Sequence, residues 1–426
     1  MFSQLGLGPT TCAGLARLGY ETPTPIQTEA IPLVMSGVDL LARAQTGTGK
    51  TAAFALPMID RLWKRGTAQR RSPGALVLVP TRELAIQVHQ ALVTYATPTP
   101  LRVCAIFGGV AMGGQIHQLR RGVDIVVATP GRLIDHLQRK TIDLSAIEVL
   151  TLDEADRMLD MGFMPALKRI ATVLPRDRQT LLFSATLSSA VTRLAAEFTR
   201  DAKKIDVSPK QMVAATVTHQ VHDVSVDRKR DVLSHILTQP GTGQALVFCR
   251  TKRGANRVGE DLDRRGLRTG IIHGDKTQGA RTRALADFKS GRVRVLVATD
   301  VAARGLDIAH LPLVVNFDLP LVPEDYVHRV GRTGRAGEAG RAVSLVTSSE
   351  AGLLRQIQRV VAAPLERVAA PVVTVTEGDR AAGSAPHVHR SDDPSPRRKH
   401  YGKPADARRQ HKPWQRPSGE RRLTAV

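Results

Sequence analysis

Two short stretches carry residues whose types and spacing suit phosphate and metal chemistry. In Ala44–Thr51, glycines at 47 and 49 precede Lys50. Such glycines leave backbone N–H groups open to a phosphate, and the lysine supplies a compensating charge. The second stretch, Asp153–Asp156, reads Asp-Glu-Ala-Asp and directly follows an apolar run. Carboxylates at such a position are what a Mg²⁺ ion bridging nucleotide phosphates requires.

The glycine-rich stretch departs from the usual phosphate-loop pattern at one place. The pattern begins with glycine, whereas this chain has Ala44. Alanine still permits a tight exit from a strand, and Gly-Lys-Thr between a strand and a helix is a specific combination. We therefore expect the nucleotide-binding loop to consist of Ala44, Gln45, Thr46, Gly47, Thr48, Gly49, Lys50 and Thr51.

Apolar strand-like runs alternate with helical segments along most of the chain. This alternation predicts an α/β fold with two tandem doubly wound parallel sheets. Because parallel strands share one carboxyl edge, the polar clusters that follow the strands should lie together there. The runs are residues 39–42, 75–80, 102–107, 124–128, 147–152 and 179–183 in the first half, then 244–249, 269–272, 292–298 and 313–317.

Length and composition predict two domains and a tail. The 426 residues divide into an amino-terminal domain (1–208), a second domain without a phosphate loop (209–369) and a tail (370–426). Residues 201–223 are interpreted as the link between the domains. From Pro371 on, the chain carries a net charge of +6 and many prolines, so we expect a disordered tail whose charge suits a polyanion.

The formal net charge of +22 and the pI of about 10.8 indicate a polyanionic partner. No apolar run reaches the length of a membrane span, and residues 1–9 do not resemble a signal peptide. Nucleic acid is thus favoured over a membrane, and the cytoplasm over export. Cys12, Cys104 and Cys249 lack metal-ligand spacing and are expected to be inert.

A glutamine follows two prolines near the amino terminus. The amide of Gln27 could donate to and accept from an adenine edge, and Tyr20 or Phe2 could supply a ring face. The alternative is a joint between two helices with a solvated glutamine.

The full set of motifs resembles the DEAD-box family of ATP-dependent RNA helicases within superfamily 2. In order, they are GYETPTPIQ, AQTGTGKT, PTRELA, GG, TPGR, DEAD, SAT, HGD, ATDVAARGLDI and HRVGRTGR. The resemblance covers residues 2 to about 367 and implies two RecA-like domains. Segments after the DEAD and HGD motifs and the short basic tail further resemble the bacterial RhlE-type branch.

Chemistry and resemblance together assign roles in the first domain. Lys50 is expected on the β- and γ-phosphates of ATP, while Thr51 and Asp153 hold Mg²⁺ directly or through water. Glu154 is the candidate general base for the attacking water. Asp156 is expected to orient the neighbouring loop, which contains Ser184 and Thr186.

The second domain is expected to complete the ATP site. Arg332 and Arg335 stand three residues apart on a glycine-rich turn and suit charge stabilisation on the transferring phosphoryl group. Asp307 is expected to meet the ribose. His328 resembles the family's link to the γ-phosphate region.

The candidate RNA-binding residues follow strands in both halves. They are small, hydroxyl-bearing or basic rather than aromatic, which suits sequence-independent contacts to phosphates and 2′-hydroxyls. They are Thr81, Arg82, Gly109, Thr129, Pro130, Gly131 and Arg132 in the first half, and Thr251, Gly274, Asp275, Gln278, Arg281 and Thr299 in the second.

These features favour an ATP-dependent RNA helicase over two alternatives. A processive DNA helicase or translocase is disfavoured by the Gln27 segment and the Asp-Glu-Ala-Asp sequence. A non-enzymatic RNA clamp is disfavoured because the chain retains the residues expected to hydrolyse ATP, namely Lys50, Glu154, Arg332 and Arg335. Ribosomal particles and the RNA-decay machinery are both compatible partners.

Overall fold

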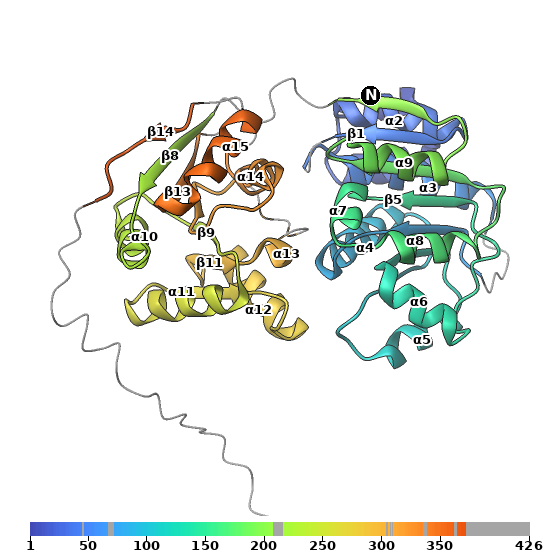
Figure 1. Cartoon of the computed structure of the whole chain (residues 1–426). Coiled ribbons are helices and arrows are strands. Elements are labelled where there is room, and N and C mark those ends of the chain that lie inside the picture. Colours follow the sequence, from blue (N-terminus) through green and yellow to red (C-terminus); the bar gives the residue numbers. More distant parts are fainter. Residues whose placement is uncertain are drawn as a thin grey trace, which may run out of the picture. The chain divides into compact units, whose positions relative to one another are not determined.

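The structure is a computed structural model that describes residues 1–44, 47–66, 72–207, 216–303, 306, 308, 310–334, 339–361 and 364–371. Two seven-stranded sheets dominate it, and every pairing between their strands is parallel. Helices cover both faces of each sheet (Figure 1). The predicted α/β fold of two tandem doubly wound sheets is confirmed.

The first sheet has the strand order β3-β4-β2-β5-β6-β1-β7. Its central strands are buried along their whole length, as expected of parallel strands covered on both faces. The strands are β1 (Leu40–Arg43), β2 (Ala75–Leu78), β3 (Val103–Ile106), β4 (Ile125–Ala128), β5 (Val149–Leu152), β6 (Gln179–Ser184) and β7 (Lys203–Asp206).

Two groups of helices sandwich this sheet. One face packs against α2 (Pro25–Met35), α3 (Lys50–Lys64) and α4 (Arg82–Ala96). A short amino-terminal layer, η1 (Phe2–Leu5) and α1 (Pro9–Arg17), packs outside α2 and α3. The other face is covered by α5 (Met112–Arg120), α6 (Pro130–Gln138), α7 (Ala155–Asp160), α8 (Met164–Ala171) and α9 (Ser189–Phe198).

The second sheet has the order β10-β11-β9-β12-β13-β8-β14, the same arrangement as the first. Its carboxyl ends form a second edge for polar residues. The strands are β8 (Val217–Asp223), β9 (Ala245–Phe248), β10 (Thr269–Ile272), β11 (Val295–Ala298), β12 (Leu313–Asn316), β13 (Gly340–Val346) and β14 (Glu366–Arg367).

The helices of the second domain again divide between two faces. One face packs against α10 (Lys229–Thr238) and α11 (Lys252–Arg264). The other packs against α12 (Gln278–Lys289), α13 (Asp300–Ala303), α14 (Pro323–Val330) and α15 (Ala351–Val361), with η2 (Ser348–Glu350) preceding α15.

The prediction that residues 201–223 form an interdomain link is wrong for most of that segment. Residues 203–206 are β7 and residues 217–223 are β8. In β7 only Ile205 is buried, because this edge strand turns two lysines to solvent. In β8, histidines and threonine interrupt the apolar alternation. Only residues 208–215 of the predicted link lie outside the described part.

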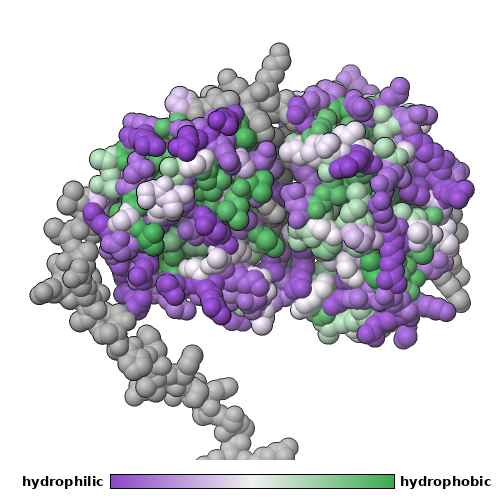
Figure 2. Space-filling view, in the orientation of Figure 1, coloured by the Kyte–Doolittle hydropathy of each residue, from purple (hydrophilic) through white to green (hydrophobic). Residues whose placement is uncertain are grey.

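The predicted disorder of the basic tail concerns residues outside the described ranges. Within those ranges, no helix has both the length and the apolar character needed to cross a bilayer. On the face drawn in Figure 2, hydrophilic side chains surround smaller apolar areas on both domains.

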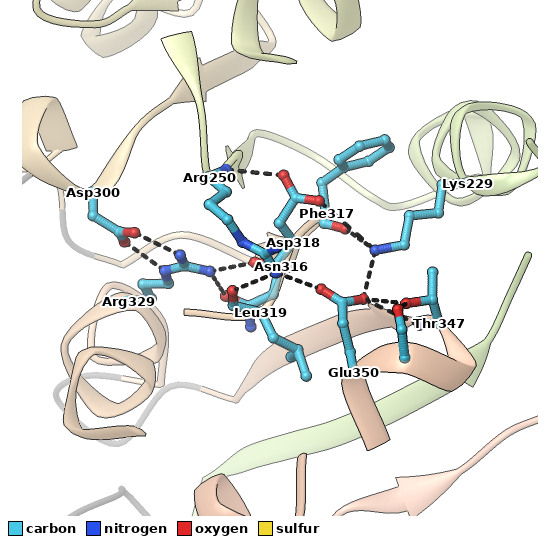
Figure 3. A network of polar contacts seen from close by, with 11 residues as sticks. Lys229, Arg250, Asp300, Asn316, Phe317, Asp318, Leu319, Arg329, Thr347 and Glu350 are labelled. Carbon is cyan, nitrogen blue, oxygen red and sulfur yellow. Dashed lines mark hydrogen bonds and ion pairs between the residues drawn. The ribbon is translucent and has the colours of Figure 1, made fainter. Parts of the chain in front are cut away.

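A network of ion pairs and hydrogen bonds, most of them buried, connects strand ends in the second domain (Figure 3). Glu350 accepts hydrogen bonds from Lys229 Nζ at 2.9 Å and from Arg250 Nη2 at 2.7 Å. Thr347 donates to the same carboxylate from its backbone N–H at 3.1 Å and from its hydroxyl at 3.0 Å. Burial alone would raise the pKa of Glu350, but the bonds from Lys229 and Thr347 outweigh burial and lower it. Glu350 thus holds α10, β9 and β13 together.

Replacing Glu350 with alanine should destabilise the second domain by about 3 kcal/mol, because the buried Lys229 would lose its nearest carboxylate and keep only Phe317 O at 2.8 Å and Asp318 at 3.8 Å. Urea unfolding of the full chain measures this. The folded-state pKa of Glu350 is lowered, so its contribution is present above the ordinary glutamate pKa and lost as pH falls through the folded-state value. The difference between the two proteins should therefore shrink on acidification.

Asp287→Ala is the control for that experiment. Asp287 pairs with Arg292, whose side chain is 71% exposed, so its loss should cost no more than about 1 kcal/mol. Equal destabilisation by both substitutions would contradict the special role of Glu350.

Candidate functional site

The predicted phosphate loop joins β1 to α3 in the first domain. Gly47 and Gly49 have φ angles of 84° and 92°, the left-handed region that glycine adopts without strain. The helix begins at Lys50, whose side chain is 6% exposed and whose Nζ lacks a hydrogen-bond partner among the described residues. Gln45 and Thr46 lie outside the described part. A buried ammonium without a partner at a helix start fits an anionic phosphate.

The acidic stretch follows β5, two strands away from β1 in the sheet. Asp153 and Glu154 are 3% and 4% exposed and line one cavity together with Lys50 and Thr51. Burial, with Glu154 and Asp156 adding to it, raises the pKa of Asp153 to about 6, although Lys50 opposes the change. A cation beside Asp153 would favour its charged form. These residues therefore fit Mg²⁺ as well as phosphate.

Glu154 has an unusual backbone conformation. Its φ and ψ are 54° and 52°, in the left-handed region, and it is the residue that precedes α7. This conformation costs a residue other than glycine about 1–2 kcal/mol. Arg157 Nε lies 3.5 Å from Glu154 Oε2 and is itself buried. Sequence reasoning missed Arg157, and only its i,i+3 spacing from Glu154 could have indicated it.

Asp156 connects the acidic stretch to the end of β6. Its Oδ2 accepts from the backbone N–H groups of Ala185 and Thr186 at 3.1 and 3.0 Å, and from the Thr186 hydroxyl at 3.2 Å. Ser184 is buried, and its hydroxyl accepts from Thr186 N at 3.4 Å. Asp156 is thus placed to orient this loop.

Gln27 contacts the phosphate loop itself. Its Nε2 donates to Gly49 O at 3.2 Å, and its Oε1 accepts from Thr24 N at 3.0 Å. A Cβ atom at Gly49 would lie 2.4 Å from Gln27 Nε2, so glycine is required there for space as well as conformation. With 2% exposure, Gln27 is not the solvated glutamine of the alternative interpretation.

An aromatic cluster lies beside Gln27. The rings of Phe2 and Tyr20 are 6.4 Å apart, and the Tyr20 and Tyr95 hydroxyls are 3.0 Å apart. Tyr20 and Tyr95 both line the cavity that contains Gln27, whereas Phe2 is buried behind them. Sequence reasoning missed Tyr95 because it lies within α4, far from any motif.

The RNA candidates of the first domain lie at the ends of three adjacent strands, β3, β4 and β2. The Arg82 guanidinium lies directly against Gly109, where a Cβ atom would be 2.0 Å from Nη1. Arg132 donates to Val110 O at 3.2 Å. Thr81 accepts from Leu84 N and is buried as the cap of α4. Thr129, Pro130 and Gly131 form the start of α6.

The RNA candidates of the second domain follow β9, β10 and β11, which are also adjacent. Thr251 caps α11 by accepting from Gly254 N at 2.9 Å. Asp275 accepts from Lys252 Nζ at 2.6 Å, and this bond lowers the pKa of Asp275. The other candidates are Gly274 after β10, Gln278 and Arg281 in the first turns of α12, and Thr299 after β11.

Arg329, on α14, is a residue that sequence reasoning missed. It is 2% exposed and binds Asp300 through Nε at 2.6 Å and Nη2 at 2.7 Å. Its Nη1 donates to Asn316 Oδ1 and Asp318 O at 2.9 and 2.7 Å (Figure 3). The guanidinium also lies 4.9 Å from the Phe248 ring centroid. Arg329 thus fixes α14 to the ends of β9, β11 and β12.

This attachment positions the turn that carries the predicted arginine finger. His328 lies in the last turn of α14. Arg332 follows the helix, is buried, and donates from Nη1 to Leu306 O at 2.5 Å. Arg335 and Asp307 lie outside the described residues.

Known proteins share both the sequence and the fold. Residues 24–194 match the DEAD/DEAH box helicase family, and residues 228–337 match the helicase conserved C-terminal domain. The DEAD-box ATP-dependent RNA helicase CshA of Bacillus cereus is 43% identical over 372 residues, which are 87% of this chain and 70% of that protein. The chain belongs to the DEAD-box family of ATP-dependent RNA helicases.

Further comparisons agree with this family. CshA of Bacillus subtilis is 41% identical over 374 residues, 87% of this chain and 74% of that protein. The structure of S. cerevisiae Dbp5 bound to RNA and ADP BeF3 has a TM-score of 0.77 and 33% identity, covering 87% of this chain and 95% of that one. As a DEAD-box protein, this chain is an ATP-dependent RNA helicase. Its placement in the RhlE-type branch stays a prediction.

Glu154→Gln should keep ATP binding and lower RNA-stimulated ATP hydrolysis by about 10²–10⁴-fold, because an amide cannot accept the proton of the attacking water. Steady-state hydrolysis with saturating RNA measures the effect. The same substitution at the exposed Glu29 is the control and should leave turnover unchanged. Turnover within a few-fold of wild type in Glu154→Gln would exclude Glu154 as the base.

Gln27→Ala should weaken ATP more than GTP. An adenine contact of this type contributes on the order of 1–3 kcal/mol, taking the magnitude for base readout. Competition binding with ATP, GTP and inorganic tripolyphosphate separates base recognition from phosphate binding. If all three weaken equally, Gln27 acts only by holding Gly49.

Proposed function

We propose that this DEAD-box protein binds RNA through sequence-independent backbone contacts and uses ATP to unwind short duplexes locally or to remodel ribonucleoprotein. The observation that carries the proposal is the buried Lys50 amine without a partner, in one cavity with Asp153 and Glu154. A protein that only binds RNA, without hydrolysing ATP, does not need these three side chains in one cavity. Small and basic residues at neighbouring strand ends in each domain support contact with the RNA backbone.

In the proposed reaction, Lys50 neutralises the β- and γ-phosphates while Thr51 and Asp153 hold Mg²⁺. Glu154 accepts a proton from the attacking water, and its fixed left-handed backbone keeps the carboxylate in place. Arg332, assisted by Arg335, stabilises the charge on the transferring phosphoryl group. Asp156 links this chemistry to the loop after β6. His328, on α14, is assigned to the link with the γ-phosphate region. Asp307 is assigned to the ribose.

Mg²⁺ would be bound mainly by phosphate oxygens and water, since it keeps several waters in such sites. Among the described residues, no cluster of three or more metal-ligating side chains exists. That arrangement is compatible with a metal that arrives with the nucleotide. The ion would neutralise charge on the phosphates during transfer.

The remaining assignments are also proposals. We place the domains at 1–208 and 209–369, followed by the tail at 370–426. A cytoplasmic location, and ribosomal particles or RNA-decay machinery as partners, rest on the sequence and await direct tests. Cells in which RNA is crosslinked to the protein and then sequenced would identify the bound RNA.

The helicase should hydrolyse ATP faster with single-stranded RNA than with DNA of the same length and sequence, because 2′-hydroxyl contacts contribute to binding. Hydrolysis rates across a concentration series of each nucleic acid, at one salt concentration, test this. Equal stimulation by DNA would instead support the alternative of a DNA translocase.

A further inference from the structure

A second basic site lies in the first domain, at the sheet edge opposite the phosphate loop. Asp39 directly precedes β1, Thr180 lies at the start of β6, and Arg200 comes shortly before β7. Because these strands are parallel, their amino ends lie on the edge away from Lys50. Here Asp39, Arg176, Arg178, Thr180, Glu197 and Arg200 line a cavity of about 310 Å³, which we call the arginine cavity.

The three arginines of this cavity have few partners. Arg176 is exposed and has no hydrogen bond or ion pair with the described residues. Arg178 donates from Nη1 to Pro175 O at 2.5 Å, but its Nε is buried without a partner. Arg200 Nη1 lies 3.7 Å from the fully exposed carboxylate of Asp177, a geometry that contributes little.

The acidic groups of the arginine cavity are already engaged. Asp39 accepts from the backbone N–H groups of Thr180 at 2.7 Å and Arg200 at 2.6 Å. Glu197 lies 3.0 Å from Lys168 Nζ. The cavity lining nevertheless has three guanidinium groups against two carboxylates, which leaves a formal excess of one positive charge.

Further exposed charges follow the cavity along the edge of the sheet, where Asp201 is acidic and the two next charged residues are basic. Lys203 and Lys204 are exposed on the edge strand β7. The backbone N–H of Lys203 donates to Asp39 O at 2.9 Å, so this strand begins next to the cavity. A row of charges longer than one phosphate matches a polymer backbone better than a small anion.

We propose that the arginine cavity and Lys203 bind phosphates of RNA outside the segment held by the catalytic RNA interface. Guanidinium groups match phosphate oxygens through paired hydrogen bonds. The proposal rests on the chain being an RNA helicase. The site anchors RNA long enough to reach both edges of the first sheet, and it takes no part in ATP hydrolysis.

The test uses the full chain with Arg176→Glu. Fluorescence anisotropy with a non-hydrolysable ATP analogue gives the affinity for a long and a very short single-stranded RNA across a salt series. We expect the long RNA to bind roughly fivefold more weakly, and the slope of log affinity against log salt to shrink by about 0.7 per lost phosphate contact. The short RNA and the turnover at saturating RNA should be unchanged.

Arg121→Glu is the matched control. Arg121 is exposed at the same sheet edge, before β4, and the strand order separates β4 from β1 and β6. This substitution makes the same charge change and should have a clearly smaller effect on the long RNA. Arg178→Gln, which removes one positive charge rather than reversing it, should weaken the long RNA less than Arg176→Glu but more than Arg121→Glu, and thermal unfolding verifies that it folds.

Three outcomes would overturn the proposal. One is equal weakening by Arg176→Glu and Arg121→Glu, and another is equal weakening of short and long RNA. The third outcome combines two results. Inorganic phosphate raises the thermal unfolding midpoint of the wild type but not of Arg176→Glu, and both proteins bind the long RNA with the same affinity. The cavity would then be a site for a small anion. RNA-stimulated ATP hydrolysis by the wild type is measured in parallel. Absence of stimulation would contradict the proposed function, whereas normal stimulation with unchanged long-RNA affinity of Arg176→Glu would contradict only the arginine-cavity proposal.

Discussion

The central constraint on the first domain is a buried positive charge at the start of α3. Lys50 is almost fully buried, yet its amine has no hydrogen-bond partner in the described part of the chain. A buried charge without a partner is costly, and a phosphate at a helix start satisfies it. The parallel sheet brings Asp153 and Glu154 to the same edge. A phosphate ligand with its metal ion could therefore balance both the lysine and the carboxylate charges. The strained backbone of Glu154 fits this requirement, since strain is retained where function demands a fixed geometry.

The second domain has the same sheet order, and two of its buried charged side chains have partners within the domain. Glu350 and Arg329 each bind several buried polar groups at strand ends, and in doing so they fix α10, α14 and the loops after β9, β11 and β12. Because Arg332 follows α14 directly in the chain, fixing this helix also positions Arg332. The two domains thus use one fold differently: Lys50 of the first has a buried amine without a hydrogen-bond partner among the described residues, whereas Glu350 and Arg329 of the second are bonded within their own domain.

Much of this was predictable, for physical reasons. Fully buried strands such as β2 and β5 are continuous apolar runs, and the polar residues after them must share an edge. The edge strand β7 was missed because lysines facing solvent hide its pattern, and β8 because histidines interrupt its alternation. Arg329 and Glu350 act through tertiary contacts with distant residues, so no local spacing reveals their roles. The engaged amide of Gln27 likewise depends on Gly49, which lies 22 residues away.

The most direct test of this account is the affinity of Lys50→Ala for a non-hydrolysable ATP analogue, measured by calorimetry with Mg²⁺ present. If the buried amine is held in place for phosphate, the substitution removes the counter-charge and nucleotide binding should be lost, while the fold, followed by circular dichroism, is retained. An affinity equal to that of wild type would contradict the account, because the nucleotide phosphates would then lie elsewhere.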